Sequence, residues 1–335
     1  MKHIARTSSE QPKDEGNAPP ALVSVCIVTF NQERYLRQCL ESVISQQTGN
    51  ILEVVIGDDC SDDGTSEIAH EYAMAHPQWI RHLRHPKRLG ASVNIQATLR
   101  QSRGQYIAHL DGDDYWLPGK LQAQTDFLDR HSECLAVYTN AIAINEDGQI
   151  IGVFNDAGDS FHDLASMFRR GNFLNTSSML YRAELKHAFE EIDRPFVDYR
   201  MHLMLAQKGL LGHLGRPMVA YRVNSPGAMT ATSGDLVREL YWEAMNSVPP
   251  ALLSASDRAQ GVADFLRRVF AATRRQRRWQ PMFTWVPRVF AASPCGRFRT
   301  CLLVLGSIAR IARAELSDRL RFPRNRTKSR VLYRR

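Results

Sequence analysis

The chain has 335 residues, of which 44% are hydrophobic and 23% are charged. This balance excludes a wholly disordered or fibrous chain and allows a core for one large domain or two ordinary ones. The net charge of +8 is unevenly spread: residues 257–335 hold 20 Lys and Arg against 4 Asp and Glu, a net of +16, so the rest carries −8.

The first strand is predicted close to the N-terminus. Residues 1–20 are polar, contain proline and lack the apolar core of a secretory signal, so we expect a disordered leader there. The run LVSVCIVTF at 22–30 is continuously apolar and rich in β-branched residues, which is typical of a strand covered on both faces. Asn31 then suits the N-cap of a helix, because Glu33 falls in its first turn and apolar residues recur at helical spacing over 35–44.

Strands and helices continue to alternate up to residue 110. A second apolar run, LEVVIGDD, ends at Asp59, and a helix is predicted near 66–75. A short strand near 80–83 and a helix near 92–101 lead into a further strand, YIAHL. This alternation predicts an α/β fold with a mainly parallel sheet flanked by helices.

A second group of elements follows residue 117. Pro118 suits the first turn of a helix, and the run LAVYTNAIAI, the turn NEDG and the run QIIGVF predict a hairpin. A helix over VDYRMHLMLAQKG, ending at Gly209, and a strand near 218–223 complete a body that closes near residue 230.

Carboxylates follow the predicted strands at their carboxyl ends, which is where open α/β sheets bind ligands. The chain has neither GxGxxG after its first strand nor a GxxxxGK[ST] phosphate loop. Acids cannot hold a diphosphate directly, because like charges repel, so we expect a divalent cation, Mg²⁺ or Mn²⁺, between them. The candidate residues at this edge are Thr29, Asn31, Asp58, Asp59, Asp111, Asp113 and Asp114.

Four ordered segments make the chain resemble the family-2 glycosyltransferases of GT-A fold. They are VSVCIVTFNQERYLRQCLESV, EVVIGDDCSDDGT, RLGASVN and GQYIAHLDGDDYWLPGKL, and the resemblance extends over about residues 22–225. It implies a GT-A domain at 21–230, with a nucleotide-sugar-binding half at 21–117 and an acceptor half at 118–230. The implied roles are the nucleobase pocket for Thr29, Asn31 and Asp58 or Asp59, the ribose for Asp111, and the metal for Asp113 with Asp114 beside it.

The segment FVDYRMHLMLAQKG, followed by MVAYRVNSPG, resembles a subset of these enzymes in which the acid that opens the helix is the catalytic base. Asp198 has that place. The implied reaction is inverting transfer of a sugar from a nucleoside diphosphate sugar, most commonly a UDP-sugar, to an acceptor hydroxyl. Asp198 would remove the proton of that hydroxyl, and such general-base catalysis raises the rate by ~10²–10⁴-fold. The chain departs from the family pattern at Arg88, where Asn is usual, and at Asn224, where His is common. The structural alternatives are a solvated acidic turn at 111–114, a cap of the following loop by Asp58 and Asp59, and a helix cap at Asp198.

The C-terminal part predicts a basic helical extension at 231–320 and a loose basic tail at 321–335. Its arginines alternate with Phe and Trp side chains and flank apolar faces, a pattern that suits an anionic membrane surface. Packing of these helices on the body, with a solvated basic face, is the alternative interpretation.

The resemblance implies a setting in surface polysaccharide or glycolipid biosynthesis, with a glycan or lipid-linked acceptor. Six cysteines without a CxxC pair favour a reducing compartment, and no run reaches the ~18 apolar residues of a membrane span. We therefore expect a cytoplasmic protein, peripheral on the inner face of the plasma membrane if the extension binds lipid. A pI of 9.3 raises a nucleic-acid-binding protein with a structural α/β body as a competing hypothesis, but no helix-turn-helix, zinc or RNP signature supports it. An inactive sugar-nucleotide-binding module is a third hypothesis, and the candidate acids and base argue against it.

Overall fold

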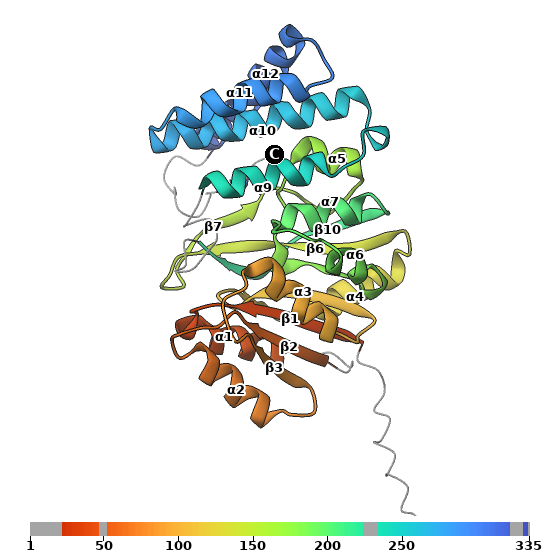
Figure 1. The fold of residues 1–335 in the computed structure, drawn as a ribbon, viewed down its shortest axis with the longest axis vertical. Helices are drawn as coiled ribbons and strands as arrows, with labels where there is room; N and C mark the ends of the chain where they lie inside the picture. Colours follow the sequence, from red (N-terminus) through yellow and green to blue (C-terminus); the bar gives the residue numbers. More distant parts are fainter. Residues whose placement is uncertain (1–21, 47–51, 224–233, 322–330, 334–335) are drawn as a thin grey trace, which may run out of the picture.

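The computed structural model describes residues 22–46, 52–223, 234–321 and 331–333. Its first half is a parallel sheet in the order β3-β2-β1-β4 (Figure 1). The strands are β1 (Val23–Thr29), β2 (Leu52–Asp58), β3 (Ile80–Arg84) and β4 (Tyr106–Asp111), and the helices between them are α1 (Glu33–Ile44), α2 (Thr65–Ala75) and α3 (Ala91–Gln101). The predicted alternation of strands and helices is therefore confirmed in this half.

The register of these strands decides where the predicted acids meet. Thr29 pairs with Asp58 across β1 and β2, and Val28 pairs with Asp111 across β1 and β4. The carboxyl ends of the strands consequently lie side by side at one edge of the sheet.

Beyond β4 the sheet is mixed, so the expectation of a mainly parallel sheet holds only for the first half. Strand β6 (Cys134–Ile144) runs antiparallel to β7 (Ile150–Asn155), which confirms the predicted hairpin, and parallel to β10 (Leu210–Arg222). Antiparallel β9 (Leu180–Arg182) joins the two halves by pairing with both β4 and β6. The remaining elements of this part are β5 (Tyr115–Trp116), α4 (Lys120–Arg130), β8 (Ser160–His162), α5 (Leu164–Arg170), η1 (Thr176–Ser178), η2 (Ala183–Leu185), α6 (Lys186–Glu190) and α7 (Asp198–Ala206).

The C-terminal helices pack on the body through a shared apolar core. They are α9 (Gly234–Asn246), α10 (Ala255–Gln276), α11 (Gln280–Ala292) and α12 (Arg297–Arg321), with a short turn, η3 (Pro250–Leu252), before α10. One cluster of buried side chains runs from Phe168 of α5 and Tyr199 of α7 through Trp242 of α9 and Phe265 of α10 to Trp285 of α11. Figure 1 shows α10, α11 and α12 at one end of the molecule and α1, α2 and β1–β3 at the other.

Two local predictions at helix starts are wrong. Asn31 is not the N-cap of α1, because the helix begins at Glu33 after Gln32 and Asn31 has φ +52°. Side chains of the loop after β2 satisfy this turn instead: Thr65 Oγ1 accepts from Gln32 N at 2.7 Å, and an Asp63 oxygen accepts from Glu33 N at 3.1 Å. Pro118 precedes rather than opens α4, which begins at Lys120 after a left-handed Gly119.

The predicted tail is not loose throughout. Residues Val331–Tyr333 form β11, which pairs in parallel with β7, because the apolar VLY triplet can extend the sheet at that edge. The predicted leader, the boundary near residue 230 and most of the tail lie outside the described residues. Among the described helices, none combines the length and the apolarity needed to span a bilayer.

Candidate functional site

Three carboxylates lie together after β4. Asp111 ends this strand, and Asp113 and Asp114 follow in the loop to β5. One carboxylate oxygen from each lies within 4.8 Å of the others, and Asp113 and Asp114 are buried. Clustered oxygen ligands of this kind suit a hard divalent cation such as Mg²⁺ or Mn²⁺, so the donor set fits the expected metal.

The electrostatics of the cluster also favour a cation. Burial, together with the charges of Asp113 and Asp198, raises the pKa of Asp111 to about 7. Burial and the neighbouring acids raise the pKa of Asp114 well above its usual range. Like charges in a low-dielectric site oppose one another's ionisation, and a positive charge between them would reverse that effect.

Glycine between the acids permits a close approach of two strands. The Gly112 amide donates to Val28 O at 2.9 Å, which fastens the loop against the end of β1. A β-carbon at Gly112 would come 2.5 Å from Gln32 Oε1 and 2.9 Å from Thr29. Such a contact is too short for any side chain, so the loop can close in this way only with glycine.

Ser177 and Arg222 hold the acidic loop from outside. Ser177 Oγ donates to Asp114 Oδ2 at 2.6 Å and accepts from Asp111 N at 3.1 Å. Arg222 donates its amide to Asp114 Oδ1 at 2.8 Å and its Nε to Asp113 O at 2.9 Å. Its guanidinium also donates to Asn145 O, Glu146 O and Gln38 Oε1 and lies over the ring of Tyr35. Both oxygens of Asp114 therefore already accept hydrogen bonds from the protein.

Asp58 is the more deeply buried acid of the second segment. Its Oδ1 accepts from both the amide and the hydroxyl of Ser61, while Oδ2 lies 3.8 Å from His82 and 3.6 Å from Arg84. Burial alone would raise the pKa of this carboxyl, but the nearby His82 ring and the hydrogen bonds from Ser61 prevail and lower the pKa to about 2. Asp58 is thus an ionised acid turned toward protein partners.

Asp59 fastens the loop that leads into α3. Its Oδ1 accepts from Leu89 N at 2.7 Å and its Oδ2 from Gly90 N at 2.9 Å. Its own amide donates to Thr29 O at 3.0 Å. Asp59 therefore ties the end of β1 through its amide and the segment RLG through its carboxylate.

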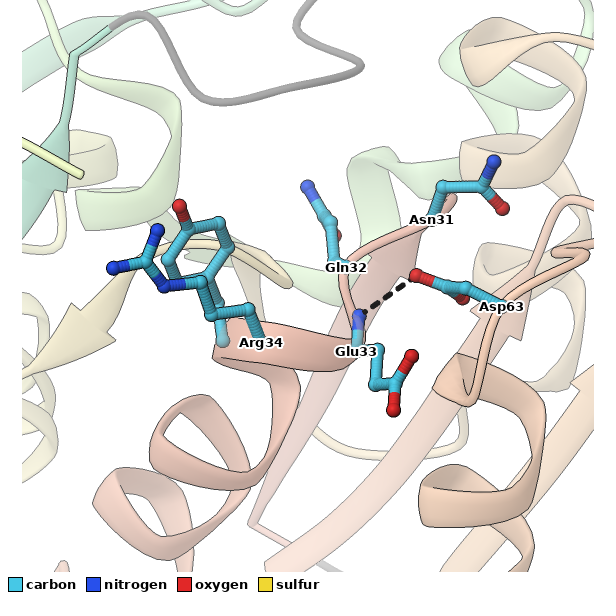
Figure 2. Close-up of a pocket in the computed structure, with 6 residues that line it drawn as sticks. Asn31, Gln32, Glu33, Arg34 and Asp63 are labelled. Atoms are coloured by element: carbon cyan, nitrogen blue, oxygen red, sulfur yellow. Dashed lines mark hydrogen bonds between the residues drawn. The ribbon is translucent and has the colours of Figure 1, made fainter.

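A pocket of about 420 Å³ lies at the first turn of α1 (Figure 2). Gln32, which lines it, approaches Gly112 of the acidic loop. Asn31 borders it with its amide paired to Asp62: Nδ2 donates to Oδ1 at 2.6 Å, and Oδ1 accepts from Asp62 N at 3.0 Å. Thr29 is buried beneath and donates its hydroxyl to Gln32 Oε1 at 2.8 Å. The residues that line the pocket are Asn31, Gln32, Glu33, Arg34, Tyr35 and Asp63.

Asp198 opens α7 and is held by three donors. Asn172 Nδ2 and Tyr199 N donate to its Oδ1, and Thr176 Oγ1 donates to its Oδ2, each at 2.8 Å. Asn172 Oδ1 in turn lies 3.1 Å from Nδ1 of buried His202, whose pKa burial lowers to about 4. An uncharged His202 must donate this Nδ1 proton, because an amide oxygen only accepts. The Asp198 carboxylate is therefore held in one orientation by its neighbours.

The structure brings the predicted acids to one edge. Asp58, Asp59 and Asp111 lie at the ends of adjacent strands, and Asp198 is close enough for its charge to raise the pKa of Asp111. The turn η1 connects the two parts of the site, because Thr176 contacts Asp198 and Ser177 contacts Asp114.

Sequence reasoning missed three residues that position these acids: Asn172, Ser177 and Arg222. Ser177 is one of three adjacent polar residues, 176–178, whose pattern does not indicate a contact with Asp114, and Arg222 lies within the segment MVAYRVNSPG, which resembles the family only in sequence. Asn172 carries no sequence signal, since its link to Asp198 spans 26 residues.

Comparisons with known proteins agree with this geometry. The model of the family described as glycosyl transferase family 2 matches residues 24–186. An uncharacterized protein of Mycobacterium tuberculosis is 31% identical over 234 residues, which are 70% of this chain and 67% of that protein. The Escherichia coli UDP-Glc:alpha-D-GlcNAc-diphosphoundecaprenol beta-1,3-glucosyltransferase WfaP is 28% identical over 220 residues, 65% of this chain and 84% of its own length. The crystal structure of S. aureus TarS 1–349 in complex with UDP-GlcNAc superimposes with a TM-score of 0.62 at 19% identity, covering 84% of this chain and 83% of that one, a likeness of fold.

Proposed function

Because the chain belongs to glycosyl transferase family 2, we propose that it moves a sugar, with inversion, from a nucleoside diphosphate sugar to an acceptor hydroxyl. A UDP-sugar is the donor that we propose first. Residues 21–117 would bind the donor, and residues 118–230 the acceptor. The observation that carries the proposal is a cluster of three acids, Asp111, Asp113 and Asp114, which η1 links to Asp198 at the start of α7.

The acid cluster would hold Mg²⁺ or Mn²⁺. When bound, the cation would neutralise the diphosphate and stabilise the charge that the leaving group gains. Asp113 is our first choice of ligand, and Asp111 would lie nearer the ribose. Asp114 joins through lone pairs that Ser177 and Arg222 leave available, since each carboxylate oxygen can accept two hydrogen bonds or ligands.

Polar residues at the ends of β1 and β2 would form the nucleobase pocket. We assign Thr29, Asn31 and the Asp58–Asp59 pair to it. Asp59 fastens Leu89 and Gly90, and Asp58 contributes a buried negative charge beneath the same edge. Recognition of a base by such groups depends on their fixed orientation, which these hydrogen bonds provide.

Asp198 would be the catalytic base. An acceptor hydroxyl attacks C1 of the sugar, the C1–O bond to the diphosphate breaks, and the hydroxyl proton passes to Asp198. Asn172 and Thr176 leave lone pairs of the carboxylate free to accept that proton while they fix its direction. Inversion needs no covalent intermediate with the enzyme, so no protein nucleophile is required.

The acceptor that we propose is a glycan or a lipid-linked saccharide in polysaccharide biosynthesis. The relative WfaP, by its name, acts on a diphosphoundecaprenol-linked sugar, and the basic C-terminal helices would suit an acceptor at an anionic lipid surface. We propose a cytoplasmic location at the inner face of the plasma membrane for the same reason.

A panel of nucleotide-sugars with Mn²⁺, read as release of nucleoside diphosphate, tests this function. We expect one donor to be turned over, and a chelator to abolish the release. If no donor stabilises the protein against heating in Mn²⁺ while a DNA duplex binds tightly, the proposal fails. Binding of UDP and Mn²⁺ without any transfer, for any donor and acceptor, would instead indicate an inactive sugar-nucleotide-binding module.

A further inference from the structure

One face of α12 carries large apolar side chains into solvent. Phe298, Leu302, Leu305 and Leu316, here called the α12 stripe, are 77%, 53%, 61% and 58% exposed. Their spacing of four, three and eleven residues places them on one side of a helix, since ~3.6 residues make one turn. Large apolar side chains that are exposed together on one helix face indicate an interaction site.

The opposite face of α12 is already used for folding. Thr300 and Ser307 are buried, and Val304 packs against the apolar core. Gln260 of α10 donates to Ser307 Oγ at 3.1 Å. These residues lie about half a turn from the stripe, at ~100° per residue, so α12 is docked on α10 with its second apolar face outward.

Charge around Phe298, Leu302 and Leu305 is entirely positive in sequence, whereas Glu315 and Asp318 flank Leu316. Residues 265–314 contain eleven arginines and no Asp, Glu or Lys. Three of these arginines are paired within the fold, Arg267 and Arg268 with Asp264 and Arg288 with Glu239. The other eight are exposed, and they are Arg274, Arg275, Arg277, Arg278, Arg297, Arg299, Arg310 and Arg313.

We propose that the α12 stripe and its flanking arginines dock the protein on a bilayer that contains anionic lipid. Leucine and phenylalanine side chains would enter the acyl boundary, and Arg297, Arg299, Arg310 and Arg313 of the same helix would contact lipid phosphates. The reason why the protein would bind lipid rests on the proposed function, because a lipid-linked acceptor would lie at that surface. Its evidence is independent of the reaction.

The observations favour a bilayer over two other occupants. A symmetric dimer through this face would set identical arginine clusters against each other, which like charges oppose. Nucleic acid would neutralise the arginines but leave four large apolar side chains without a partner, because protein surfaces that bind nucleic acid are polar and positively charged. A lipid surface satisfies the apolar and the charged groups together.

The test is sedimentation of the full chain with vesicles of phosphatidylcholine and phosphatidylglycerol in equal parts. We expect the protein to pellet with these vesicles, to stay in solution with pure phosphatidylcholine, and to be released by salt, because each arginine contributes about fivefold in affinity near an anionic surface. The double variant Leu302→Glu/Leu305→Glu should bind at least about 100-fold more weakly, since each inserted leucine contributes about tenfold or more.

A matched variant controls for the added charge. Met74→Glu/Ile150→Glu makes the same charge change at side chains that are 66% and 58% exposed on α2 and β7, away from α12. It should pellet like the unchanged protein, and both double variants should keep the circular dichroism and UDP–Mn²⁺ binding of the parent.

Four outcomes would overturn the inference. They are no pelleting of the parent, equal pelleting of the two double variants, tight binding of a DNA duplex without vesicle binding, and a dimer that only the α12 variant dissolves. Pelleting needs no donor and no turnover. A chain that binds vesicles but fails the nucleotide-sugar panel would therefore refute the proposed reaction and leave the lipid surface standing, and the reverse result would do the opposite.

Discussion

Ser177→Ala removes the hydroxyl through which η1 holds the acid cluster. The lost bond joins a buried hydroxyl to the Asp114 carboxylate at 2.6 Å, and the same oxygen also accepts from Asp111 N at 3.1 Å. A hydrogen bond to a charged group contributes about 1.5–3 kcal/mol, and a buried group left without its partner costs about 1–3 kcal/mol. We therefore expect the free energy of unfolding to fall by about 2–4 kcal/mol, and the affinity for UDP in the presence of Mn²⁺ to fall at least about tenfold.

The neighbouring residue is a matched control. Ser178 is equally buried, and its hydroxyl also donates one bond and accepts one, but its partners are Asn175 O and Thr139 N. Ser178→Ala should thus lose similar stability while it retains UDP–Mn²⁺ affinity. Urea unfolding measures the first quantity and calorimetric titration of UDP with Mn²⁺ the second. Retention of full UDP affinity by Ser177→Ala, or an equal loss in Ser178→Ala, would refute the assigned positioning role.

Three further predictions concern the base, the acidic loop and buried histidines. Asp198→Asn should leave UDP–Mn²⁺ affinity unchanged and slow transfer by ~10²–10⁴-fold, and full transfer would remove the base assignment. Gly112→Ala should lower the free energy of unfolding by about 1–3 kcal/mol through its clash with the buried Thr29 side chain, whereas Gly158→Ala, which faces open space, should be near neutral in urea unfolding. Burial lowers the pKa of His109 to about 3 and of His162 to about 4, below the usual 6.5. Below pH ~6.5 the unfolded chain binds more protons at these histidines and at His202, which lowers stability by up to about 1.4 kcal/mol per pH unit for each histidine. The raised pKa values of Asp111 and Asp114 act in the opposite direction, so we expect a smaller net fall, and a stability that rises between pH 6.5 and 4.5 would contradict this.

Local patterns in the sequence determined the first half of the fold, from β1 to β4. Strands β1, β2 and β4 are short, largely apolar runs that suit burial on both faces, β3 is a more polar edge strand, and the helices between them carry their own periodicity. Because parallel strands joined by helices end at one edge, the chain order alone placed Asp58, Asp59 and Asp111 together. The hairpin of β6 and β7 and the helix that Asp198 opens were also predictable, since a turn and a helical pattern are encoded within a few residues.

Tertiary structure decided which residues hold those acids and which helix faces stay exposed to solvent. The bonds from Ser177 and Arg222 to Asp114 span 63 and 108 residues, and such contacts depend on how whole elements pack rather than on any local pattern. For the same reason the sequence misplaced the cap of α1, whose donors are satisfied by a loop that follows a different strand. Amphipathic periodicity predicted that α12 has an apolar face, but only its docking on α10 decided which side is buried and which side stays in solvent.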